Sequence, residues 1–125
     1  MGTFLVKTTP TGVKFDLKAG NGEVILSSEV YSSEAACTKG MNSIIKNAPI
    51  ARLEDQTIEG YETAINPKFE VYKDKAGEFR FRLKARNGQV IGASEGYIQK
   101  HSCLNGIESV RKNAADAKIV YAEKE

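Results

Sequence analysis

The chain has few of the residue types on which most catalytic and metal centres depend. Its 125 residues include one histidine, two cysteines and no tryptophan. The histidine, His101, and the cysteines, Cys37 and Cys103, match no ligand spacing of a structural zinc site. On a helix, residues two apart point in directions about 200° apart, so His101 and Cys103 cannot form a direct catalytic pair. We therefore expect no catalytic residues, no metal and no cofactor.

Long apolar runs are absent as well. A membrane-spanning helix needs about 20 consecutive apolar residues, and the first residues, MGTFLVK, lack the apolar centre of a signal peptide. We expect a cytoplasmic protein with no membrane partner, in which a reducing environment keeps both cysteines as free, buried thiols. The net charge of +2 is too small to indicate a nucleic-acid partner by itself.

What the chain does contain is an internal repeat. Val13–Ile25 reads VKFDLKAGNGEVI, and Glu78–Ile91 reads EFRFRLKARNGQVI. Aligned from Phe15 with Phe81, about half of the positions are identical through Ala48 and Ala114. We interpret the chain as one domain, residues 1–125, made of two tandem repeats. The expected divisions are repeat 1 at about 3–55, a connector at 56–67 and repeat 2 at about 68–121.

Both repeats predict the same series of elements. In Glu78–Arg86 apolar and charged side chains alternate, which is typical of a strand with one buried face and one wet face. Asn21-Gly22 and Asn87-Gly88 predict two-residue hairpin turns of type I′. Ser32 or Ser33 would cap the first helix. We expect three strands, a helix and a strand in each repeat, at residues 4–8, 14–19, 23–27, about 32–47 and 50–55, and at residues 69–73, 78–86, 89–94, 98–113 and 118–121.

Each predicted helix carries one apolar stripe with a glycine beside it. The stripes are Cys37, Met41, Ile44 and Ala48 in repeat 1, and Cys103, Ile107, Val110 and Ala114 in repeat 2. Gly40 and Gly106 lie inside the helices, where glycine costs about 1 kcal/mol relative to alanine. We infer that the helix backbone closely approaches the sheet or the partner helix at these positions.

These matched motifs, two copies of strand–strand–NGxVI–SExY–helix–KNA, resemble the YegP-like family of small bacterial proteins of unknown function. The resemblance covers almost the whole chain apart from the connector and the last few residues. It implies an α+β fold: two β-β-β-α-β units share a single antiparallel sheet, exchange their C-terminal strands and place two helices on one face. It also implies a monomer with internal pseudo-two-fold symmetry, and it brings no catalytic residues. The first turn of repeat 1, where TTPTGV replaces KDKAGEF, is one residue shorter, so its register stays open.

The strongest functional hint is a row of basic residues on the outer face of the second strand of each repeat. As a possible anion-binding face we identify Arg80, Arg82, Lys84, Arg86, Lys14 and Lys18. Tyr72 on the neighbouring strand would join this face, and cations with an aromatic ring on an open sheet can follow a phosphate backbone. The alternative, which we prefer, is a solvated face whose charges pair across strands.

The second candidate is the motif Ser-Glu-x-Tyr, which occurs once in each repeat at the junction of strand and helix. Its residues are Ser28, Glu29, Tyr31, Ser94, Glu95 and Tyr97. One interpretation is that the serine and glutamate bind backbone amides while the tyrosine anchors the junction. The other is a pair of symmetry-related sites.

These observations favour a non-catalytic binding or interaction module. Two alternatives stay open: a weak, sequence-tolerant nucleic-acid or polyanion binder that uses the basic face, and an enzyme of unrecognised type. The sequence indicates neither a ligand nor a partner nor a pathway.

Overall fold

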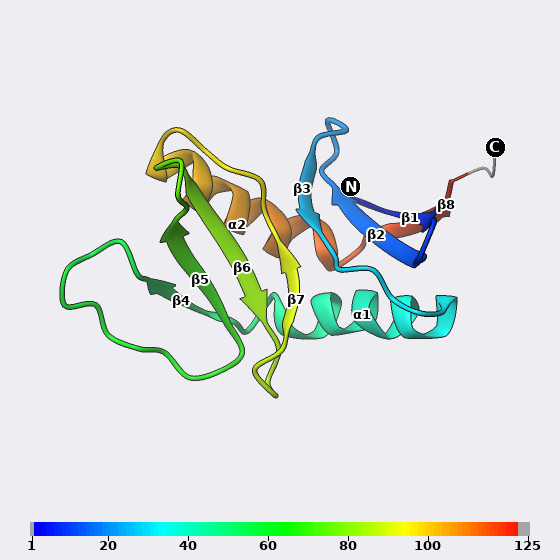
Figure 1. Cartoon of the computed structure of the whole chain (residues 1–125), viewed down its shortest axis with the longest axis horizontal. Helices are drawn as coiled ribbons and strands as arrows, with labels where there is room; N and C mark the ends of the chain where they lie inside the picture. Colours follow the sequence, from blue (N-terminus) through cyan, green and yellow to red (C-terminus); the bar gives the residue numbers. More distant parts are fainter. Residues whose placement is uncertain (1, 123–125) are drawn as a thin grey trace.

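The computed structural model of the protein describes residues 2–122, which form eight strands and two helices (Figure 1). In chain order these are β1 (Thr3–Thr9), β2 (Gly12–Lys18), β3 (Val24–Ser27), α1 (Glu34–Asn47), β4 (Arg52–Asp55), β5 (Lys68–Lys73), β6 (Phe79–Lys84), β7 (Val90–Ala93), α2 (Lys100–Ala114) and β8 (Lys118–Tyr121). The strands form one sheet, with α1 packed on β2 and β7 and α2 on β6, β3 and β2. The predicted α+β fold with two helices on one face is confirmed.

The two repeats exchange their last strands, as the resemblance implied. The sheet order is β4-β5-β6-β7-β3-β2-β1-β8. Exchanging each strand for its equivalent in the other repeat gives the same order read from the opposite edge. The expectation of an entirely antiparallel sheet needs correction at both edges, because β4 pairs with β5, and β8 with β1, in parallel. Parallel pairing is possible there because no tight turn joins the paired strands: residues 56–67 connect β4 to β5, and β1 and β8 lie at opposite ends of the chain. The sheet is therefore mixed.

The Asn-Gly turns are hairpins, but not of the predicted two-residue type. Gly22 has a φ of 87°, whereas no residue other than glycine in the described part of the chain has a positive φ. A type I′ turn would need positive φ at Asn21 too. Instead the Gly22 amide donates to Ala19 and the Ala19 amide donates to Glu23, which makes a three-residue loop with glycine in the left-handed position. The hairpin at Asn87-Gly88 has the same bonds.

The asparagine in each turn has a different role from the one predicted. Oδ1 of Asn21 accepts a hydrogen bond from the Glu23 amide at 3.0 Å, and Asn87 binds the Gln89 amide in the same way. The side chain thus replaces a missing backbone acceptor, as Asn often does in turns. The first turn of repeat 1 is a loop of two residues, because Thr9 pairs directly with Gly12.

The helices follow their predicted stripes closely. Ser33 caps α1, and its hydroxyl accepts a hydrogen bond from the Ala36 amide at 3.1 Å. The second helix begins at Lys100, two residues later than predicted, and its N-cap residue Gln99 makes no side-chain capping bond. All eight stripe residues are buried between the helices and the sheet.

The core lies between the helices and one face of the sheet. Four phenylalanines are wholly buried, and they pack edge to face in two equivalent pairs, Phe4 with Phe15 and Phe69 with Phe81. Each pair joins the first two strands of one repeat. The inward positions predicted from alternation in β6, including Phe81 and Leu83, are confirmed. Within residues 2–122, neither helix has the length and apolarity needed to cross a bilayer.

Candidate functional site

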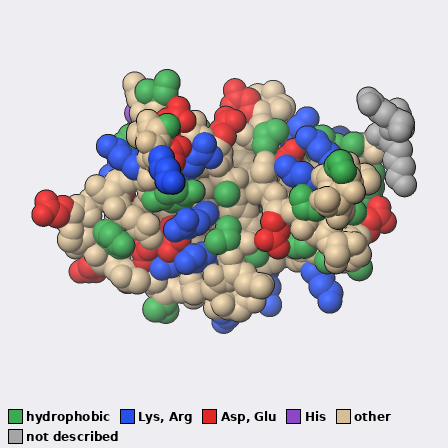
Figure 2. Space-filling view, viewed as in Figure 1, with side chains coloured by type: hydrophobic (Ala, Val, Ile, Leu, Met, Phe, Trp, Pro, Cys, Tyr) green, Lys and Arg blue, Asp and Glu red, His purple; other side chains and the backbone are tan. Residues whose placement is uncertain are grey.

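The predicted basic face is a face of paired charges. It lies on the side of the sheet away from the helices, and Figure 2 shows basic and acidic side chains interleaved over it. Nε of Arg80 lies 2.6 Å from Oδ2 of Asp74, and Nε of Arg82 lies 2.6 Å from Oε1 of Glu70. Nζ of Lys84 lies 3.3 Å from the other oxygen of Glu70. Each cation on β6 therefore already has a carboxylate partner.

The same pairing occurs in repeat 1, on a smaller scale. The Asp16 carboxylate, which is 4% exposed, lies 2.7 Å from Nζ of Lys7 and 3.2 Å from Nζ of Lys14. Burial alone would raise the pKa of Asp16, but the bonds from Lys7, Ser27 and Lys14 outweigh burial and lower it. Lys18 lies at the end of β2. As expected, Tyr72 joins the outer face, and the Arg82 guanidinium stacks 4.5 Å from the centre of its ring.

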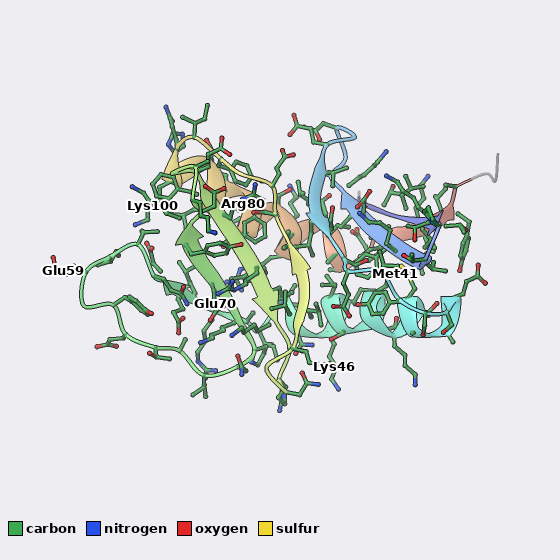
Figure 3. All side chains as sticks on the ribbon, viewed as in Figure 1. Met41, Lys46, Glu59, Glu70, Arg80 and Lys100 are labelled. Atoms are coloured by element: carbon green, nitrogen blue, oxygen red, sulfur yellow. The ribbon has the colours of Figure 1, made fainter. Side chains whose placement is uncertain are left out.

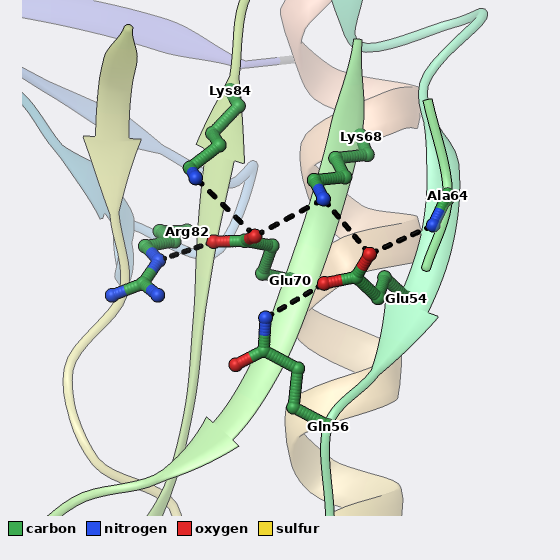
Figure 4. A network of polar contacts seen from close by, with 7 residues as sticks. All are labelled: Glu54, Gln56, Ala64, Lys68, Glu70, Arg82 and Lys84. Carbon is green, nitrogen blue, oxygen red and sulfur yellow. Dashed lines mark hydrogen bonds and ion pairs between the residues drawn. The ribbon is translucent and has the colours of Figure 1, made fainter. Parts of the chain in front are cut away.

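Two residues that sequence reasoning missed, Glu54 and Lys68, form the centre of a buried ion network on this face (Figure 4). Nζ of Lys68 lies 2.8 Å from Oε1 of Glu54 and 3.3 Å from Oε2 of Glu70. Glu54 also accepts bonds from the Gln56 side chain and the Ala64 amide, both at 2.7 Å. Two residues of the connector thus bind the Glu54 carboxylate.

The hydrogen bonds of Glu54 determine its ionisation. Burial alone would raise the pKa of its carboxyl, but bonds from Lys68, Gln56 and the Ala64 amide outweigh burial and lower the pKa from 4.5 to about 2. The pKa of Lys68 is raised, chiefly by its bond to Glu54. Alternation along β5 indicates that Lys68 shares a face with Glu70, but no local signal places Glu54 beside them. Only the exchange of β4 into the other repeat does so.

One member of the predicted basic face does not lie with the rest. Strand β6 ends at Lys84, where the register with β7 shifts. Arg86 is in the following turn and lines a cleft beside α1 together with Lys39 and Lys46. The alternation of inward and outward side chains along β6 is interrupted at this register shift, so the prediction that Arg86 lies on the outer face is wrong.

The serine of each Ser-Glu-x-Tyr motif completes the backbone bonding of the sheet. The Ser28 hydroxyl accepts from the Phe15 amide at 2.9 Å and donates to the Glu29 carbonyl at 2.7 Å. Ser94 makes the same two bonds in repeat 2, at 2.9 and 2.8 Å. The Glu29 side chain is exposed, as is that of Glu95. The serine hydroxyls therefore bind the backbone of the sheet, whereas the two glutamate side chains face solvent.

The tyrosine of each motif explains the helix glycines. Tyr31 stacks on Phe15 with ring centres 6.3 Å apart, and its hydroxyl lies against α1, where a Cβ on Gly40 would overlap it. A Cβ on Gly106 of α2 would lie 2.6 Å from the Tyr97 hydroxyl oxygen. The inferred close approach to the helix is thus made by the tyrosine, which reaches it from the strand-to-helix junction.

A cleft opens where each helix faces the hairpin of the other repeat. The first cleft lies between α1 and the β6–β7 hairpin, and has two adjoining hollows of about 420 and 400 Å³ with four lining residues in common. The second, of about 290 Å³, lies between α2 and the β2–β3 hairpin. The motif tyrosine, the helix glycine and the hairpin asparagine line both, as Tyr31, Gly40 and Asn87 and as Tyr97, Gly106 and Asn21. The two clefts are therefore related by the pseudo-two-fold symmetry.

The remaining candidates from the sequence stay apart from these clefts. Cys37 and Cys103 are free and buried. Burial raises the pKa of the Cys103 thiol to about 11, and it raises that of Cys37 as well. His101 is exposed on the first turn of α2. No group of three or more metal-binding side chains occurs within residues 2–122.

Comparison with known proteins matches the two repeats separately and the chain as a whole. A family model described as a domain of unknown function, DUF1508, matches residues 12–55 and 74–120. The UPF0339 protein YegP of Yersinia pestis is 42% identical over 120 residues, which are 95% of this chain and 94% of that protein. A UPF0339 protein of Treponema denticola is 66% identical over 53 residues, which are 42% of this chain but 91% of that protein. The shorter relative therefore corresponds to about one repeat.

A solved structure shares the fold. The solution NMR structure of yegP from E. coli, described as a protein of unknown function, has a TM-score of 0.77 and 32% identity to this chain. The match covers 98% of this chain and 96% of that one. The likeness extends over both repeats, and its description names no ligand or activity.

Proposed function

Since the chain belongs to the DUF1508 (UPF0339) family, which is described as of unknown function, we propose its role from its surface: it is a non-catalytic module that binds a ligand in the clefts between the repeats. The observation that carries the proposal is that two related clefts each combine a helix of one repeat with a hairpin of the other. Small-molecule sites occur preferentially in such concave regions between structural units.

The candidate nucleophiles of the chain, which do not line the clefts, favour binding over catalysis. The thiols of Cys37 and Cys103 have raised pKa values because they are buried, so they are poor nucleophiles at neutral pH. The hydroxyls of Ser28 and Ser94 donate to backbone carbonyls beside them. An activated serine would instead need a general base as its hydrogen-bond acceptor.

The outer face is the second candidate, as a binder of nucleic acid or another polyanion. Arg80, Arg82 and Lys84 would each have to exchange a carboxylate of the same face for a phosphate. That exchange reduces the free energy gained from each contact. Binding there would be weak, and we rank it below the clefts.

The proposal includes a monomer in the cytoplasm. Each repeat supplies the outermost strand that the other lacks, which supports a self-sufficient chain. Both thiols are unpaired, as is usual in a reducing compartment.

NMR spectroscopy of the full chain tests the proposal. Amide resonances would be followed while a fractionated small-molecule extract of bacterial cells is added. We expect shifts in residues 36–47 with 85–91, or in residues 102–109 with 19–25. The variants Ala36→Leu and Ser102→Leu would obstruct the first and second cleft respectively, because each residue lines one of them. Shifts confined to β5 and β6, or unchanged by either variant, would contradict a role for the clefts.

A further inference from the structure

We infer that the first cleft, between α1 and the β6–β7 hairpin, binds a small molecule through a phosphate or carboxylate group; this rests on the proposed function and names the ligand class for one of the clefts. The hollow of about 420 Å³ is lined by three cations, Lys39, Lys46 and Arg86, and no carboxylate is among its lining residues. The adjoining hollow adds one carboxylate, Glu29. The cleft as a whole is therefore cationic.

The cations come from two elements that face each other. Lys39 and Lys46 are seven residues apart on α1, with Ser43 between them on the same face of the helix. Lys46 is in the last turn of α1, where the helix passes the β6–β7 turn that carries Arg86 (Figures 1 and 3). An anion in the cleft would contact charges from both repeats.

These cations are available, in contrast to those of the outer face. Within residues 2–122, no carboxylate lies within ion-pair distance of Lys39, Lys46 or Arg86. A ligand anion would therefore not have to break an ion pair to bind them. Arg82, by comparison, would first have to release Glu70.

The second cleft is formed by the equivalent helix and hairpin but has no positive charge in its lining. At the positions equivalent to Lys39 and Arg86 it has Asn105 and Gly20, and at the position equivalent to Gln89 it has Glu23. Asn105 and Glu23 line it, with no cation among its lining residues. The two clefts thus share a tyrosine, a glycine and an asparagine but differ in charge. We therefore expect an anionic ligand to bind in the first cleft and not in the second.

The chemistry of the first cleft suits a compact anionic group. Lysine and arginine bind phosphate and carboxylate oxygens through charge-assisted hydrogen bonds. The amides of Asn42 and Asn87, which also line the cleft, can donate further bonds. Its volume falls within the usual range for small-molecule sites, about 300–1,000 Å³.

The test uses the full chain, with pyrophosphate as the phosphate probe and citrate as the carboxylate probe. Amide shifts would be titrated at low salt, with glycerol as a neutral control. We expect saturable shifts in residues 39–47 and 85–89, and we expect them to weaken with added salt. Whichever of the two probes binds with the higher affinity shows whether the cleft prefers phosphate or carboxylate.

Exchanging residues between the clefts provides matched variants. Lys39→Asn with Arg86→Gly gives two positions of the first cleft the residues of the second, keeps Lys46, and should weaken binding about tenfold. Gly20→Arg with Asn105→Lys should create binding in the second cleft. Gly20 is exposed and its φ is not positive, so a side chain fits there. Lys84→Ser removes a cation of the outer face and should leave the affinity unchanged.

Three outcomes overturn the inference. They are that neither probe binds, that the Lys39 and Arg86 variant binds as tightly as the natural chain, or that the shifts lie on β5 and β6. If a neutral ligand from the cell extract shifts the cleft residues while both anions fail, the anionic class is wrong and the binding module stands. If nothing from the extract shifts either cleft, the proposed function fails too.

Discussion

Leu26 fills the space in which a side chain at residue 92 would lie. A Cβ on Gly92 would be 2.7 Å from Cδ2 of Leu26, which is wholly buried. The two residues occupy equivalent positions in the two repeats, on the strands β3 and β7 that join the halves of the sheet. One large and one small side chain therefore meet beside the pseudo-two-fold axis.

This arrangement predicts that the stability of the protein depends strongly on having the large residue at position 26 and the small one at position 92. Gly92→Leu places a second leucine against Leu26 and should lower the free energy of unfolding by about 3 kcal/mol or more, because overpacking forces neighbours to move. Leu26→Ala should cost about 2–5 kcal/mol through the cavity it leaves. Urea titrations of each variant measure both effects.

The exchanged pair is the decisive comparison. In the double variant Leu26→Gly with Gly92→Leu, the new leucine enters the space that Leu26 vacates, so the cost should be clearly less than the sum of the single costs. Additive costs would mean that the two side chains do not share one space.

Tyr31 and Gly40 give the second prediction. Alanine in a helix is preferred to glycine by about 1 kcal/mol, yet Gly40→Ala should destabilise the protein by about 1–3 kcal/mol, because the new methyl group would overlap the tyrosine hydroxyl and lie 2.7 Å from Cζ. Adding Tyr31→Phe removes the hydroxyl and should recover part of the loss.

Repeat 2 provides the control for this pair. Gly106→Ala meets the Tyr97 hydroxyl at 2.6 Å and should show the same pattern with Tyr97→Phe. Thermal unfolding of the four single and two double variants decides the matter. A Gly40→Ala protein more stable than the natural chain would refute the close approach.

Glu54 gives a prediction about pH. Its pKa is about 2 in the folded protein against an ordinary 4.5. Because the folded pKa is the lower of the two, the ionised group stabilises the fold above pH 4.5, and this is lost as the pH falls from 4.5 towards 2. The loss should amount to about 3 kcal/mol at most.

Urea titrations at a series of pH values measure this dependence. Glu54→Gln should be less stable at neutral pH and should lose less stability on acidification than the natural chain. Glu59→Gln is the control, since Glu59 projects outward from the connector (Figure 3) and is exposed. Equal acid sensitivity of natural chain and Glu54→Gln would exclude this group as a source of it.

Most of the fold could be predicted because its signals are local. Alternation identified the buried faces of β2 and β6, the apolar stripes identified α1 and α2, and Ser33 marked the start of α1. The start of α2 was less accurate because Gln99 provides no capping bond. The Asn-Gly turns were assigned the wrong type, since the dipeptide occurs in several hairpins and the backbone angle of Asn21 is not visible in the sequence.

The candidate sites were less predictable because they depend on contacts between the repeats. Nothing near Glu54 in the sequence indicates that Lys68 will lie 2.8 Å away, since the exchanged strand alone brings them together. The charge of Arg86 was evident, but its place depends on where β6 ends. The first cleft joins Lys39 to the β6–β7 turn, more than forty positions later in the chain. The periodicity of apolar residues reveals local structure and gives no information on contacts between residues so far apart in the sequence.

The last prediction concerns an isolated repeat, and it follows from the exchanged strands. The fragment of residues 66–125 keeps β5, β6, β7, α2 and β8 but loses β4, the parallel partner of β5. Two copies can restore the sheet if β8 of each pairs with β5 of the other, as β8 pairs with β1 in the full chain. Beside the two-fold axis, two Gly92 residues would then meet without overlap. The fragment of residues 1–56 would instead bring two Leu26 side chains together.

We expect sedimentation to show the first fragment as a folded dimer with concentration-dependent melting, and the second as unfolded or a weaker dimer. A stable, folded monomer of residues 66–125 would contradict the need for an exchanged strand.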